Sequence, residues 1–134
     1  MFRTPLVDTE LARVPLLEGL SSREVNTVAH LSTRIDLPAG SVLTREGDHG
    51  TEFIIVIDGQ VDVVQRGEVI ATRFAGAHLG EIALLSAQPR TATLVTTTPV
   101  HARVASRQEF ASLLATVPNL SERLAVTMAE RLAA

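Results

Sequence analysis

The stretch LGEIALLSAQPRTATLVT, residues 79–96, decides the fold of this chain. Gly80 permits backbone conformations that other residues avoid, and it leaves room for the close approach of another group. Residues 81–85 are long enough for about one helical turn. The start of such a turn presents unpaired backbone N–H groups and the positive end of a dipole, which together favour an anion.

The two charged residues of this stretch add a second indication. Arg90 carries a planar set of donors that matches phosphate oxygens. Glu81 would repel the same anion, so we expect it to accept hydrogen bonds from neutral hydroxyls nearby. An anion beside a hydroxyl, held by an arginine at one end and a glutamate at the other, describes a ribose phosphate.

The motifs LGEIAL (79–84) and RTA (90–92) resemble the phosphate-binding cassette of cyclic nucleotide-binding domains. These domains occur in catabolite-activator-type regulators, cyclic-nucleotide-dependent kinases and gated channels. A second family pattern matches GDHG (47–50), FIIV (53–56) and Gly59. The chain departs from the family at Leu43-Thr44, where two apolar residues are usual, and this affects strand packing only.

The resemblance implies the ligand and its contacts. Arg90 is expected to pair with the exocyclic phosphate oxygens, and Glu81 to accept from the ribose 2′-OH. Backbone amides around Ile82, Ala83 and Ala92 would complete the anion cradle. The expected ligand-binding residues are Gly80, Glu81, Ile82, Ala83, Arg90, Thr91 and Ala92. The expected ligand is cAMP, with cGMP left open because Thr91 can serve either base; no catalytic residue, metal or further cofactor is expected.

The rest of the chain predicts a mainly β fold, an antiparallel jelly-roll barrel of about eight short strands flanked by N-terminal and C-terminal helices. Glycines mark most of the turns. The expected strands are 34–37, 41–45, 52–58, 60–65, 68–74, 90–98 and 100–105. We expect one domain over 1–134, with a helical segment at 1–33, the barrel at 34–105 holding the cassette at 79–93, and helices at 106–134.

Helix boundaries follow from capping patterns. Ser21 with Glu24, and Ser106 with Glu109, have the spacing of a capping box. The first helix should run to about Ser32, and residues 1–10 should form an arm or a short helix. Toward the end of the chain, Pro118 interrupts the helical period, which continues over 120–134.

In the family, the last helix covers the ligand or forms a dimer seam. Its candidate lid residues are Leu124, Thr127, Met128 and Arg131. For each of them, packing on the barrel or on a second copy is the favoured interpretation. Val63, Leu84 and Leu94 could line the base pocket or fill the core, and the core is favoured for each.

Composition limits the other functions. The 134 residues include 12 Arg, no Lys and 15 acids, for a net charge of −3, which argues against sequence-independent DNA binding. The absence of Cys excludes disulfides and thiolate sites. No apolar run approaches the roughly 20 residues of a membrane span, and no secretory leader is evident. We therefore expect a soluble cytoplasmic domain without nucleic-acid or membrane partners.

Two alternatives belong to other classes. A cupin-like metal enzyme would need a His-x-His pair, whereas His30, His49, His78 and His101 are scattered. A degenerate member of the family, serving as a protein-interaction module, is disfavoured by the intact Glu81 and Arg90. No helix-turn-helix follows the last helix, so we expect a standalone sensor or the regulatory domain of a larger protein. Its expected partners are a cyclic nucleotide and, through the C-terminal helix, a second copy or an effector.

Overall fold

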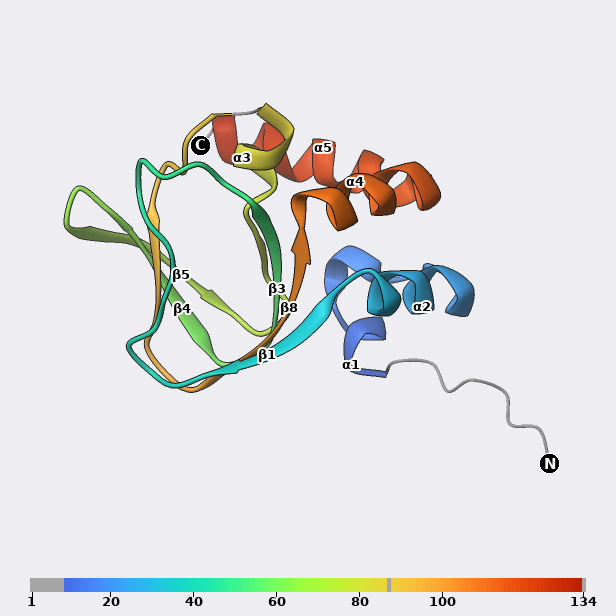
Figure 1. Ribbon diagram of the computed structural model, residues 1–134, viewed down its shortest axis with the longest axis horizontal. Coiled ribbons are helices and arrows are strands. Elements are labelled where there is room, and N and C mark those ends of the chain that lie inside the picture. The colour runs from blue at the N-terminus through green and yellow to red at the C-terminus, as the bar shows by residue number, and fades with distance from the viewer. Residues whose placement is uncertain (1–8, 87, 134) are drawn as a thin grey trace.

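The computed structural model describes residues 9–86 and 88–133, and two antiparallel four-stranded sheets face each other in it (Figure 1). One sheet has the order β1-β8-β3-β6 and the other β2-β7-β4-β5. The strands are β1 Thr33–Leu37, β2 Val42–Thr44, β3 Glu52–Asp58, β4 Gln60–Gln65, β5 Glu68–Phe74, β6 His78–Leu79, β7 Thr93–Thr96 and β8 Val100–Ser106. These eight strands confirm the predicted antiparallel barrel flanked by helices.

The helices gather on one side of the barrel, against the sheet that contains β3 and β8 (Figure 1). They are α1 Thr9–Ala12, the 3₁₀ helix η1 Pro15–Leu17, α2 Ser22–His30, α3 Glu81–Ser86, α4 Arg107–Thr116 and α5 Pro118–Ala133. Residues 1–8 lie outside the described part, so the predicted arm is described only from Thr9. None of the helices in the described ranges is both long enough and apolar enough to span a membrane.

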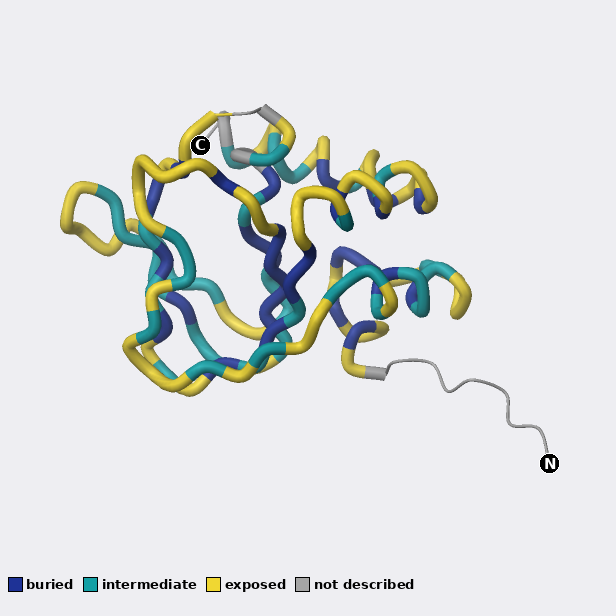
Figure 2. The backbone as a smooth tube through the Cα atoms, viewed as in Figure 1, coloured by how far each residue is buried: buried dark blue, intermediate teal, exposed yellow. Residues whose placement is uncertain are grey.

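β3 explains how a barrel and a helical layer share one core. Its side chains alternate between two faces, as a strand requires. Phe53 and Ile55 pack among the helices, whereas Ile54 and Val56 face the barrel interior. Because both faces are covered, the strand is a continuous apolar run, and Figure 2 shows the buried residues concentrated along it.

Both predicted capping boxes are present. In each, the serine hydroxyl accepts from the backbone N–H of the glutamate at 3.1 Å, and the carboxylate accepts from the serine N–H at 3.0 Å. α4 ends at Thr116 with Val117 as its C-cap, and α5 begins at Pro118 rather than at Leu120. Proline fits this position because the first N–H of a helix has no partner within the helix.

Residues 79–96 contain the end of β6 and all of α3 and β7. The predicted strand over 90–98 is too long, because β7 covers only Thr93–Thr96. The backbone of Arg90 bonds instead to the preceding turn: its N–H donates to Asp48 O at 2.7 Å, and its carbonyl accepts from Gly47 N at 2.8 Å. The two-residue strand β6 was not predicted, and it pairs with β3.

Candidate functional site

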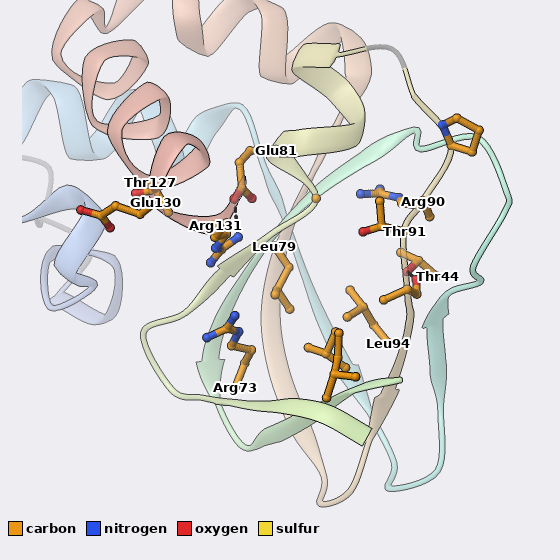
Figure 3. Close-up of a pocket in the computed structure, with 15 residues that line it drawn as sticks. Thr44, Arg73, Leu79, Glu81, Arg90, Thr91, Leu94, Thr127, Glu130 and Arg131 are labelled. Carbon is orange, nitrogen blue, oxygen red and sulfur yellow. Dashed lines mark hydrogen bonds and ion pairs between the residues drawn. The ribbon is translucent and has the colours of Figure 1, made fainter. Parts of the chain in front are cut away.

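A cavity of about 450 Å³ lies between the barrel and the C-terminal end of α5 (Figure 3). Its volume is within the range of small-molecule sites. The lining residues are Thr44, Val63, Ile70, Arg73, Leu79, Gly80, Glu81, Pro89, Arg90, Thr91, Ala92, Leu94, Thr127, Glu130 and Arg131. Five of the predicted site residues are therefore brought to one cavity. Ile82 and Ala83 belong to the first turn of α3, and their side chains lie outside the described part.

Gly80 is required where the cassette begins. Its φ of +97° is a conformation that favours glycine. A Cβ atom there would lie 2.6 Å from Arg90 Nη1 and 2.6 Å from the carbonyl oxygen of Glu52. Glycine thus allows the guanidinium of Arg90 to pack directly against the backbone that leads into α3.

Arg90 is a fixed and largely buried cation. Only 7% of the residue is exposed, and Nη2 donates to the Glu52 carbonyl oxygen at 2.5 Å. Burial lowers the pKa of Arg90, while the charges of Glu52 and Glu81 oppose that shift. An arginine so placed remains charged at neutral pH. No carboxylate in the described ranges forms an ion pair with it, so its charge is available to a ligand in the cavity.

Glu81 lies across the cavity from Arg90 and is completely buried (Figure 3). Its Oε1 forms an ion pair with Nη1 of Arg131, while its Oε2 is buried and has no hydrogen-bond partner among residues 9–86 and 88–133. Burial raises the pKa of Glu81, and the positive charge of Arg131 acts in the opposite direction. One acceptor oxygen of this carboxylate is therefore still unsatisfied.

Arg131 connects the last helix to the cassette. Its Nη2 donates to the carbonyl oxygen of His78 at 2.8 Å, so one guanidinium joins α5 to both β6 and α3. The packing interpretation is confirmed for Leu124, which is fully buried among the helices. Thr127 and Arg131 instead line the cavity, although packing had been favoured for each.

The floor of the cavity is apolar. Val63 and Leu94 line it and also join the hydrophobic cluster inside the barrel, so the two interpretations offered for these residues are compatible. Leu84 packs with the helical cluster, as the core interpretation predicts. Apolar walls of this kind suit the flat face of a purine.

Outside the cassette, four lining residues were not predicted from the sequence: Thr44, Ile70, Arg73 and Glu130. A signal for Arg73 was present in the strand pairing. Its register partner across the antiparallel pair β4–β5 is Val61, which is fully buried inside the barrel. Directly opposed residues share one face of a sheet, so Arg73 must face inward as well.

The site brings together a fixed cation, an unsatisfied carboxylate oxygen and an apolar floor. This combination suits a ligand that carries an anion, a hydroxyl and a flat apolar ring. Within the described residues, no group of three or more His, Asp or Glu side chains could hold a metal ion.

Comparisons with known proteins agree with the ligand type that the cavity suits. The family profile of the cyclic nucleotide-binding domain matches residues 34–117. A cAMP-dependent protein kinase regulatory subunit from Yarrowia lipolytica is 34% identical over 117 residues, covering 86% of this chain and 31% of its own length.

Two solved structures have the same fold. The catabolite activator protein of Thermus thermophilus aligns with a TM-score of 0.81 and 27% identity, over 89% of this chain and 58% of that protein. The regulatory domain of Toxoplasma gondii PKA, crystallised with cAMP, aligns with a TM-score of 0.76 and 25% identity, over 90% of this chain and 49% of that chain. The chain spans about a third of the length of the Yarrowia subunit and about half of the length of each of these two chains.

Proposed function

Since this chain belongs to the cyclic nucleotide-binding domain family, we propose that it binds cAMP in the cavity between the barrel and α5 and passes the binding event to the C-terminal helix. The relatives named above are regulatory proteins, and the activity proposed here is binding without a chemical reaction. The observation that carries the proposal is that Arg90 and the unsatisfied Oε2 of Glu81 lie on opposite sides of one cavity.

The phosphate of the ligand is assigned to Arg90. Its guanidinium can donate two parallel hydrogen bonds to the exocyclic oxygens, and the first turn of α3 supplies backbone N–H groups beside it. Thr91 and Ala92 line the cavity next to Arg90 and would complete the cradle through a hydroxyl and a backbone amide. Charged hydrogen bonds of this kind contribute about 1.5–3 kcal/mol each.

The ribose is assigned to Glu81. Its Oε2 is a buried acceptor without a donor, and a ribose 2′-OH would satisfy it. The purine would then lie on the apolar floor formed by Val63, Leu79 and Leu94. A ligand in this position satisfies a buried carboxylate oxygen that has no hydrogen-bond partner among the described residues.

The relay is assigned to α5. Glu81 has no exposed surface, and Arg131 from α5 lies against it. A ribose can therefore reach Oε2 only if the end of α5 changes position, so ligand affinity and helix position must be coupled. In the intact protein, α5 would act on whatever follows or contacts it, whether an effector or a second copy of the chain.

The ribose assignment is tested by titrating the wild-type chain with cAMP and with 2′-deoxy-cAMP in a calorimeter. The missing hydroxyl should weaken binding by tenfold or more, since about 1.4 kcal/mol corresponds to a decade. Glu81→Gln should reduce that difference, because its amide is a weaker acceptor than a carboxylate. Equal affinities of the wild type for both nucleotides would contradict the role of Glu81. Tighter binding of cGMP than of cAMP would change the ligand and leave the site in place.

The relay is tested by hydrogen exchange of the backbone amides. Saturating cAMP should change the exchange rates of α5 amides near Thr127 and Arg131, because these residues line the cavity. The amides of β1, which lies at the edge of its sheet opposite to β6, serve as the internal control. Unchanged exchange in α5 with bound nucleotide would contradict the relay.

A further inference from the structure

A second cavity, of about 380 Å³, adjoins the first and shares Arg73, Thr127 and Arg131 with it. It lies where the turn before β6 meets η1 and α5. Its lining residues are Pro15, Leu16, Arg73, Gly76, Ala77, His78, Arg123, Thr127 and Arg131. The nucleotide assignment gives this cavity no role.

The charged side chains that line this cavity are all positive. Three arginines line it, and none of its described lining residues is acidic. Arg123 and Arg131 are held in place by backbone carbonyls: Arg123 Nη1 donates to Leu16 O at 2.8 Å, and Arg131 Nη2 donates to His78 O at 2.8 Å. Their remaining N–H groups stay available, apart from the one that Glu81 engages. Three positive side chains around one cavity, two of them held in place by backbone carbonyls, create a positive potential that attracts anions.

Arg73 is the least satisfied of the three. Within the described ranges its side chain forms no hydrogen bond and no ion pair, and its Nε atom is buried without a partner. The Nε–H group has lost water without gaining an acceptor, which is unfavourable. An anion in the cavity would supply the missing acceptor.

His78 contributes a second unsatisfied buried group. The residue is 9% exposed, and its Nε2 has no hydrogen-bond partner. The distance of 4.0 Å between Nε2 and Glu81 Oε1 is too long for a hydrogen bond. Burial and the nearby arginines lower the pKa of His78 to about 4, so the ring is neutral at pH 7 and can still offer one N–H donor.

Two backbone amides of the turn before β6 are already engaged. The amide of Gly76 donates to Val56 O at 2.7 Å, and that of Ala77 donates to Phe74 O at 3.0 Å. We therefore assign recognition in this cavity to side-chain donors, and those named above are arginines and a histidine.

We propose that this second cavity is a binding site for a phosphate-type oxyanion, held by Arg73 together with Arg123, Arg131 and His78, at a position distinct from the nucleotide phosphate assigned to Arg90. Arginine forks match phosphate oxygens in geometry. Arg131 already pairs with Glu81, and a phosphate carrying two negative charges balances the other two guanidinium groups better than a single carboxylate does. The cavity has room for inorganic phosphate, pyrophosphate or the phosphate end of a small metabolite.

The test must separate this site from Arg90, which would also attract phosphate. We therefore use Arg90→Gln as the background, titrating it with pyrophosphate and inorganic phosphate by calorimetry at low ionic strength. Pyrophosphate should bind with one site per chain, and adding Arg73→Gln should weaken it by tenfold or more. Arg34→Gln is the matched control: this arginine lies on β1, outside both cavities, and should leave the affinity unchanged.

Several results would overturn the proposal. Binding that is lost with Arg90→Gln alone would place the anion in the nucleotide site, and no binding at millimolar phosphate would leave no second site. Acetate binding as tightly as phosphate would contradict the assigned anion class. Because Arg73 has no partner, Arg73→Gln without anion should melt at the same temperature as wild type or higher. A large loss of stability in that variant would instead indicate a structural role. None of these results depends on whether cAMP binds.

Discussion

Replacing Arg131 with glutamine should destabilise the protein in a way that depends on pH. Glu81 is completely buried and relies on Arg131 for its ion pair. Without that cation, the carboxylate must either stay charged in an apolar environment or take up a proton. The alternative with the lower free-energy cost determines how much stability is lost.

Protonation of Glu81 sets an upper limit to the loss in the free energy of unfolding. Protonating a carboxyl with an ordinary pKa of 4.5 at pH 7 costs at most about 3 kcal/mol. The same step costs less than about 1 kcal/mol at pH 5. Burial already raises the pKa of Glu81 in the wild type, and Arg131→Gln removes the positive charge that opposes this shift, so the folded-state pKa rises further. The folded variant then binds more protons than the unfolded chain, and its stability falls more steeply than that of the wild type as pH rises from about 4.5. The lost bond to the His78 carbonyl adds about 1 kcal/mol at every pH.

The measurement is urea unfolding at pH 5 and pH 7 of the wild type, Arg131→Gln, Glu81→Gln and the double variant. Arg131→Gln should cost clearly more at pH 7 than at pH 5, by about 2 kcal/mol. In the Glu81→Gln background the same substitution should cost about 1 kcal/mol at both pH values. Arg123→Gln is the matched control on the same helix, since it loses only a bond to the Leu16 carbonyl. An Arg131→Gln effect that is equal at both pH values, or unchanged by Glu81→Gln, would refute the reasoning.

Three further predictions concern single residues. His78 has a folded-state pKa of about 4 against an ordinary value of 6.5, so the free energy of unfolding should fall by up to about 3 kcal/mol as pH drops from 6.5 to 4. In thermal melts, His78→Phe should make stability depend less on pH in this range. An unchanged pH dependence would contradict the burial of a neutral ring. Gly80→Ala should lower the free energy of unfolding in urea by more than about 1 kcal/mol, because its Cβ would collide with Arg90 Nη1 and with a backbone oxygen. An unchanged free energy of unfolding would contradict the close packing of Arg90 against the backbone at residue 80. Ser106→Ala should lower the free energy of unfolding by about 1 kcal/mol through loss of the α4 cap, and Ser112→Ala, on the same helix, is the control.

Much of the fold could be predicted from the sequence, because local patterns determine it. Alternating and apolar runs separated by glycine turns gave the strands, and the two capping boxes gave the starts of α2 and α4. The strand predicted over 90–98 failed because Arg90 bonds to the 47–48 turn, an interaction between segments far apart in the chain. Local β propensity could not reveal that competition.

The candidate site also contains residues that a local motif predicts and residues that only the folded structure brings in. Gly80, Glu81 and Arg90 are predictable because their spacing matches a local motif. Arg131 is 50 residues from Glu81, and its insertion under the cassette depends on how α5 packs. Arg73 faces inward because it is registered with Val61, which only the pairing of β4 with β5 makes evident. Partners contributed by distant elements are the part of the site that sequence patterns miss.

The central claim is that Arg90 holds the phosphate of a cyclic nucleotide. Its most direct test is calorimetric titration with cAMP of nucleotide-free wild type, Arg90→Gln and the control Arg34→Gln, each checked for folding by circular dichroism. The account predicts one site per chain in the wild type, equal affinity in Arg34→Gln, and a loss of at least one to two decades in Arg90→Gln. Folded Arg90→Gln binding cAMP as tightly as the wild type, or a nucleotide-free wild type that binds neither cAMP nor cGMP, would contradict it.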